Sequence, residues 1–196
     1  MILITVPHAG EGDNKDEGAT IFINHLERAL ENQKVEYETL IGKTPRQIID
    51  LNRTDAYGTD FYNDFISKLP GTSVHIDLHS FFPSNKTTEH GYSLQDWGEK
   101  DITLFNVPDV TDEGLLQRFI DIFEDREIET VIQPALFENF LTNVASVLFD
   151  TPSILIEINE EAGQNFDSLA AAAAEVVAGY SADSAESEPV ADPTPV

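Results

Sequence analysis

Histidine and carboxylate side chains occur together directly after the first apolar run of the sequence. His8 and Glu11 follow residues 2–6, in a short loop where Gly10 lets both side chains turn toward one point. An imidazole and a carboxylate are ligands that zinc takes in proteins. The pair therefore predicts part of a metal site, although His-x-x-Glu is an unspecific pattern and a loop histidine bonded to backbone is the alternative.

A second group of such residues lies in the segment Ser-Val-His-Ile-Asp-Leu-His-Ser at residues 73–80. On a strand, His75, Asp77 and His79 share one face because successive side chains alternate. Only the last of them lies at the strand's end, where a sheet opens into a cleft, so His79 is the predicted third ligand. We expect Asp77 to fix the tautomer of a ligating imidazole and His75 to be structural.

A single acid, Glu157, interrupts the apolar run at residues 154–158. A buried carboxylate is costly unless a positive group receives it. A zinc ion with its bound water is one such partner, and a structural ion pair with one of the five arginines is the other.

The segment Asp50-Leu-Asn-Arg53 carries one of the few guanidinium groups of the chain. Arg53 beside Asn52 can clamp a substrate carboxylate with two hydrogen bonds or face a developing oxyanion. Arg46 is a second candidate for the same role. The alternative is an ion pair between Arg53 and a surface acid.

Apolar runs and amphipathic segments alternate along the chain, which predicts an α/β fold with a mainly parallel sheet and helices on both faces. The carboxyl ends of parallel strands line one crevice, and His8, His79 and Glu157 all map to it. The expected strands lie at residues 2–6, 35–41, 73–78, 102–107 and 153–158, with helices at 19–32, 60–69, 111–125, 137–148 and 166–180 and a helix-like turn at 44–49.

The 196 residues, 41% of them apolar, suffice for one domain, which we expect at residues 1–180. Residues 181–196 are rich in Pro, Ser and acids and are expected to form a disordered tail. The polar loop at residues 83–100 is long enough to suggest a functional role.

The formal net charge of −25 argues against a nucleic-acid or anionic-membrane partner. It suits a surface hydrated in concentrated salt, and an acidic face for cations or a basic partner is the alternative. The chain has no cysteine, no apolar run of about 20 residues and no basic segment before its first apolar stretch. We therefore expect a cytoplasmic protein from a high-salt organism, with virion association left open.

Four motifs in this order resemble the N-formylglutamate amidohydrolase family, which belongs with the zinc carboxypeptidases and aspartoacylases. They are His8-Ala-Gly-Glu11, Asp50-Leu-Asn-Arg53, Asp77-Leu-His79-Ser-Phe81 and Ile156-Glu157-Ile158. The resemblance implies a phosphorylase/hydrolase-like α/β fold, with zinc on His8, Glu11 and His79. It also implies Arg53 beside Asn52 as the substrate or oxyanion residue, and Glu157 as general base and acid.

The mechanism expected from these residues is metal-assisted hydrolysis of an amide bond in an N-acyl (N-formyl) amino acid or small peptide-like substrate. Zinc would activate a water molecule and Glu157 would move its proton. One alternative is a non-catalytic structural or virion-associated protein, which a turned-away Glu11 or a sealed Glu157 would indicate. Another is a surface that binds Ca²⁺ or Mg²⁺ through carboxylates outside the cleft.

Overall fold

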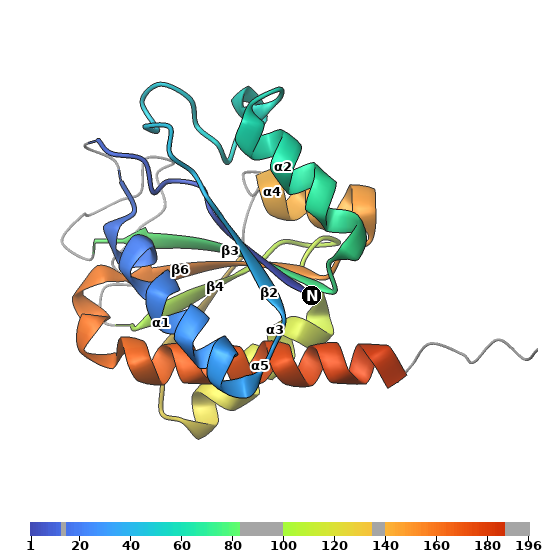
Figure 1. The fold of residues 1–196 in the computed structure, drawn as a ribbon. Coiled ribbons are helices and arrows are strands. Elements are labelled where there is room, and N and C mark those ends of the chain that lie inside the picture. The colour runs from blue at the N-terminus through green and yellow to red at the C-terminus, as the bar shows by residue number, and fades with distance from the viewer. Residues whose placement is uncertain (13–14, 83–99, 135–139, 187–196) are drawn as a thin grey trace, which may run out of the picture.

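Six strands form one mixed sheet at the centre of the molecule (Figure 1). The computed structural model describes residues 1–12, 15–82, 100–134 and 140–186. The spatial order is β2-β1-β3-β6-β4-β5; β2, β1, β3 and β6 run parallel, while β4 pairs antiparallel with β6 and parallel with β5. The strands are β1 (Ile2–Val6), β2 (Tyr37–Ile41), β3 (Val74–Phe81), β4 (Ile102–Asn106), β5 (Thr130–Pro134) and β6 (Ser153–Asn159).

Helices cover both faces of this sheet. Helices α1 (Glu17–Gln33), α3 (Glu113–Asp125) and α5 (Phe166–Glu186) pack on one face, below the sheet in Figure 1. Helix α2 (Asp60–Lys68) and the short α4 (Phe140–Asn143), which continues as a π-helical turn at Val144–Leu148, pack on the other. The described residues thus form a single α/β domain with a mainly parallel mixed sheet, as the sequence predicts.

The sequence misplaces several elements. It does not predict β5, a five-residue edge strand that ends in a proline. The helix-like turn expected at residues 44–49 is present, and in it the N–H groups of Ile48 and Ile49 both donate to the carbonyl of Pro45. Helix α5 reaches Glu186, six residues into the expected tail, whereas residues 187–196, 137–139 and most of the loop at 83–100 lie outside the described residues. Among the described residues, no helix is both long and apolar enough to cross a membrane.

The two faces of the sheet differ in polarity. The side chains of β1, β3 and β6 that face α1, α3 and α5 are aliphatic and belong to the main core. On the face toward α2 and α4, the same strands carry a row of polar residues, all buried except the partly exposed Glu157. The row consists of Thr5, His75, Asp77, His79, Ser153 and Glu157.

The connections of β1 determine at which edge of the sheet this polar row can form part of a site. From β1 the chain passes through α1 to β2 on one side, and from β2 through α2 to β3 on the other side of β1. Strand order therefore reverses between β1 and β3, and ligands of such sheets bind at the carboxyl ends of strands at this switch point. His8 follows β1 and His79 lies near the end of β3, so both flank it.

Two glycines hold the loop after β1 against the segment that follows β2. A Cβ on Gly42 would lie 2.1 Å from the carbonyl oxygen of Pro7, and one on Gly10 would lie 2.4 Å from that of Thr44. The N–H of Gly42 also donates to the carbonyl of Val6 at 2.9 Å. The backbone that precedes and follows His8 is therefore closely packed.

We expect Gly42→Ala to lower the free energy of unfolding by about 2 kcal/mol or more, because the added methyl group meets backbone that cannot move cheaply. Urea denaturation measures the change. Gly71→Ala is the matched control, since a Cβ there meets nothing within 4 Å. Equal stability of the two variants would contradict the close packing of this loop.

Candidate metal centre

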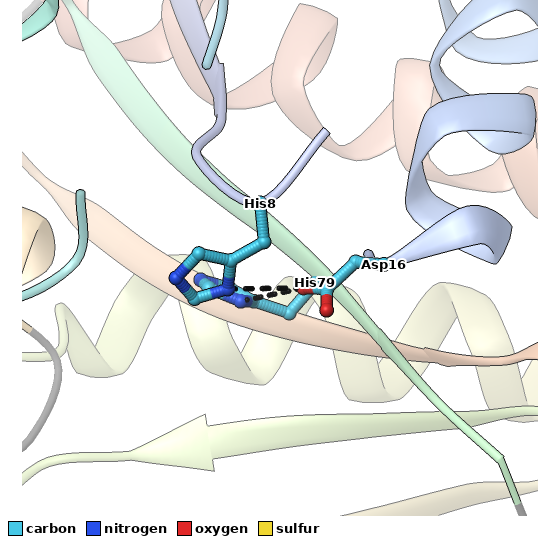
Figure 2. A group of neighbouring side chains, drawn as sticks. All are labelled: His8, Asp16 and His79. Atoms are coloured by element: carbon cyan, nitrogen blue, oxygen red, sulfur yellow. Dashed lines mark hydrogen bonds and ion pairs between the residues drawn. The ribbon is translucent and has the colours of Figure 1, made fainter. Parts of the chain in front are cut away.

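Three buried side chains from three elements meet at the carboxyl ends of β1 and β3. His8 lies in the loop after β1, Asp16 directly precedes α1, and His79 is on β3 (Figure 2). The Nδ1 atoms of His8 and His79 lie 3.3 and 3.0 Å from the same atom, Oδ2 of Asp16. Each of the three residues offers a ligand atom, and these atoms lie within 4.8 Å of one another.

This donor set fits a metal ion. Donor atoms of a tetrahedral zinc site lie roughly 3.3 Å apart when each is about 2.0–2.1 Å from the metal, which matches the spacing of Asp16 from both imidazoles. Two imidazoles and a carboxylate also leave a fourth position of a tetrahedron free. The group could therefore hold a divalent cation.

The outer nitrogens of both imidazoles are bound to carboxylates, as in most metal-ligating histidines. Nε2 of His8 lies 2.8 Å from Oδ1 of Asp50, and Nε2 of His79 lies 3.2 Å from Oδ2 of Asp77. Each ring therefore keeps its Nδ1 directed at the centre. This arrangement is the strongest sign that the histidines are oriented for a ligand.

Asn52 connects these outer carboxylates to each other. Its Nδ2 donates to Oδ2 of Asp77 at 3.0 Å and lies 2.9 Å from Nε2 of His79. Its backbone N–H donates to Oδ1 of Asp50, and its Oδ1 accepts from the N–H of Leu141 on α4. The side chain is buried, so it ties the segment after β2 to both β3 and α4.

The acids of the centre are held in their ionised forms. Burial alone would raise the pKa of Asp16, but hydrogen bonds and charge from His79 and His8 outweigh burial and lower it. The pKa of Asp50 is lowered in the same way by His8, Arg46 and the N–H of Asn52. For His79, burial opposes the charged form, yet the charges of Asp77 and Asp16 raise the pKa of the imidazole well above its usual value.

Glu157 lies beside this centre, but its pKa is raised, whereas the pKa values of Asp16 and Asp50 are lowered. It pairs with His79 across β3 and β6, so the two side chains share a face of the sheet. Its Oε2 is buried and has no hydrogen-bond partner among the described residues, and neither has the hydroxyl of Thr103, its register partner on β4. Burial raises the pKa of Glu157 to about 8; the charges of Asp16 and Asp77 add to this, whereas those of His79 and Arg46 oppose it.

A third buried histidine, His75, supports Asp77 from the side away from the centre. Thr5 donates its hydroxyl to Oδ1 of Asp77 at 2.6 Å and so accepts from Nε2 of His75 at 2.9 Å. The hydroxyl of Ser153 then donates to Nδ1 of His75 at 2.7 Å. Burial lowers the pKa of His75 to about 4, so its ring is neutral and has a structural role.

Glu11 is not part of the centre. The structure brings His8 and His79 together, but the Glu11 side chain is 93% exposed and lies 3.4 Å from the ammonium group of Lys15. The carboxylate beside the histidines is that of Asp16, eight residues after His8 instead of three. The loop conformation decides this, because the start of α1 returns to the histidines: the N–H of Asp16 donates to the carbonyl of His8 at 3.0 Å.

The two candidate arginines have different surroundings. Arg46 binds Oδ2 of Asp50 through Nε at 3.0 Å and is therefore joined to the centre, whereas Nη1 of Arg53 donates to the carbonyl of Asn52 at 2.8 Å. The roles of Asp16 and Asp50 are missed in the sequence analysis. A signal for Asp16 is its place at the start of a helix that begins at a strand's end, and a signal for Asp50 is its spacing of two from Asn52.

No protein-family model and no curated protein sequence matches the chain. Several solved structures, in contrast, are similar to this chain. N-formylglutamate amidohydrolase from Ralstonia eutropha is similar with a TM-score of 0.65 and 12% identity over 95% of this chain and 94% of that one. A gene product of Agrobacterium tumefaciens gives 0.60 and 15%, over 95% and 90% of the two chains. A metallo-carboxypeptidase from Burkholderia cenocepacia gives 0.56 and 14%, over 93% of this chain but 57% of that one.

These similarities establish the fold. The chain has the α/β fold shared by N-formylglutamate amidohydrolases and metallo-carboxypeptidases, and its length corresponds to nearly all of the former. The relation to this group of folds, inferred above from four short motifs, is thereby supported at the level of the fold.

Asp16→Asn should weaken zinc binding by at least about tenfold, because a charged ligand between the two imidazoles becomes neutral. Competition titration of chelator-treated protein against a chromophoric chelator measures the affinity. Glu11→Gln, which neutralises an exposed acid of the same loop, should bind zinc like the unmodified protein. Loss of binding in Glu11→Gln with retention in Asp16→Asn would contradict the geometry.

His75 makes stability depend on pH. Its pKa is about 4 in the folded protein and about 6.5 in the unfolded chain, so below pH 6.5 only the unfolded chain binds this proton and stability is lost. Relative to His75→Gln, the metal-free protein should lose about 2 kcal/mol of unfolding free energy between pH 7 and pH 5. Urea denaturation at both pH values checks this; a difference that does not change with pH would show that His75 is not buried in its neutral form.

Proposed function

We propose that this protein is a zinc-dependent hydrolase that cleaves an amide bond of an N-acyl amino acid or small peptide-like substrate. One observation carries the proposal. Nδ1 of His8 and Nδ1 of His79 converge on Asp16, while both Nε2 atoms are held by carboxylates. Glu157 lies beside this group, and the residues that the structure describes offer its Oε2 no hydrogen-bond partner.

His8, Asp16 and His79 would hold the zinc ion, with Asp50 and Asp77 fixing the two rings. When bound, zinc lowers the pKa of a water molecule toward about 7 and polarises a carbonyl group. The ionised state of Asp16 suits this role, since a ligand that is already deprotonated has no proton to lose on binding.

Glu157 is the proposed general base and acid. Its carboxylate removes a proton from the attacking water, and the carboxyl group so formed donates that proton to the nitrogen of the departing amine. A pKa near 8 lies close to neutrality, where one group can perform both transfers. The charge of His79 already lowers this pKa, and a cation held by the three neighbouring ligands would lower it further and favour the ionised form that begins the reaction.

The polar residues after β2 support a substrate that carries a carboxylate group. Arg53 and Arg46 supply guanidinium groups that can bind a substrate carboxylate or face the oxyanion. Both ends of the Asn52 amide are occupied, by Asp77 and by the N–H of Leu141, so Asn52 serves to hold this segment in place. A carboxylate-bearing N-acyl compound is also what the amidohydrolase neighbour's name describes.

The non-catalytic alternative has less support. A turned-away Glu11 was one sign expected of it, and Glu11 does point to solvent, but Asp16 provides a carboxylate in its place. A sealed Glu157 is the other sign; its Oε2 is buried, but the residue as a whole is partly exposed. The expected high-salt, cytoplasmic origin depends on charge composition and stays a prediction.

Glu157→Gln should retain zinc but lose turnover by a factor of roughly 10² to 10⁴, because the amide cannot accept the proton of the attacking water. Release of formate from N-formylglutamate, measured together with zinc content, tests this. N-acetyl amino acids and short peptides are assayed in parallel.

Glu161→Gln is the matched control, since it neutralises an exposed acid four residues further along. It should hydrolyse the same substrate at the rate of the unmodified protein. Full activity in Glu157→Gln would remove this residue from the mechanism, and an unmodified protein that neither retains zinc nor hydrolyses any of these amides would overturn the proposed function.

A further inference from the structure

Asp16 occupies the position that normally caps a helix, but it does not cap α1. An aspartate directly before the first helical residue usually accepts a hydrogen bond from the second or third N–H of the helix. The carboxylate of Asp16 makes no such bond, and its Oδ2 faces His8 and His79 instead. The carboxylate of Asp16 can thus either face the two histidines or cap α1, and here it faces the histidines.

Glu160 supplies the missing acceptor from a distant part of the chain. It follows β6, and its Oε1 accepts from the N–H of Gly18, the second residue of α1, at 3.2 Å. The same Oε1 accepts from the hydroxyl of Ser80, the residue after His79, at 2.7 Å. A single carboxylate therefore joins the start of α1 to the ends of β3 and β6.

The close packing at this junction requires a glycine. A Cβ on Gly18 would lie 2.8 Å from Cγ of Glu160 and 3.0 Å from Cβ of Ser80. The helix can approach the two strand ends only without a side chain at this position. Asp16, two residues earlier, is thereby placed against His79.

We propose that Glu160 is a positioning residue for the metal centre. By accepting the N–H of Gly18, it satisfies the start of α1 and leaves Asp16 free to face the two histidines. The inference rests on the proposed function for its metal ligand, but it concerns a hydrogen bond that forms in the metal-free protein as well. Without Glu160, the carboxylate of Asp16 turns back to cap its own helix.

The first test is zinc affinity, measured by competition titration. Glu160→Ala should bind zinc roughly tenfold more weakly or worse, as expected when a residue that orients a ligand is lost. Glu160→Gln should restore binding to within about threefold, because its amide oxygen can accept the same two hydrogen bonds. Glu161→Ala should bind zinc normally. Full affinity in Glu160→Ala, or equal losses in the Ala and Gln variants, would overturn the proposal.

The second test needs no metal. In chelator-treated protein with ¹⁵N-labelled histidine, the Nδ1 resonance of His79 reports its contact with Asp16. In Glu160→Ala it should move toward its position in Asp16→Asn, and in Glu160→Gln it should stay in place. An unmoved resonance in Glu160→Ala would overturn the proposal, whether or not the unmodified protein binds zinc. Absence of zinc binding in the unmodified protein would count against the proposed function alone. If Glu160→Ala does not fold, Glu160→Asp, one methylene shorter, is measured with the same expectation.

Discussion

Oδ2 of Asp16 faces two imidazoles at once, and the rest of the site is arranged around this shared contact. A buried carboxylate is stable only when its partners are fixed in place. Here each partner ring is fixed from behind, His8 by Asp50 and His79 by Asp77. The hydrogen bonds continue outward in both directions, to Arg46 on one side and through Thr5 and His75 to Ser153 on the other. Three strands, β1, β3 and β6, and the segments that follow β1 and β2 must therefore be positioned together for one oxygen atom to be satisfied.

The charges of this network explain why Glu157 differs from its neighbours. Asp16, Asp50 and Asp77 all have lowered pKa values because imidazoles or Arg46 face them. Glu157 shares their surroundings, but its Oε2 has no hydrogen-bond partner in the described segments, so burial dominates and raises its pKa. Neighbouring acids with pKa values pushed apart are typical of sites that divide ligand binding from proton transfer.

The sequence predicts the residues of this site that lie on a strand or directly after one, and it misses those whose position depends on how a longer loop turns. Alternation along β3 and the polar interruption in β6 are local patterns, so His79 and Glu157 could be assigned from the residues alone. The choice between Glu11 and Asp16 could not, because it depends on how the loop after His8 turns before α1 begins. Aspartate before a helix is read as a cap, and only the contact between Glu160 and Gly18 shows that this cap is supplied from elsewhere. The edge strand β5 was missed because five residues ending in proline give little periodicity.

The direction of β4 limits where the site can extend. Strands β2, β1, β3 and β6 all present their carboxyl ends at one edge of the sheet. The segments after β1, β2 and β6 contribute polar groups to the site or to the junction at Glu160, and β3 contributes His79 and Ser80 from its own last residues. Strand β4 runs the other way, so it meets Glu157 with a residue from within the strand, Thr103, and its own carboxyl end lies at the opposite edge. The buried Thr103 hydroxyl, which has no hydrogen-bond partner within the described part of the chain, therefore forms the boundary of the polar row. The candidate site lies between the reversal of strand order at β1 and the reversal of strand direction at β4, and Glu157 belongs to the parallel strand next to β4.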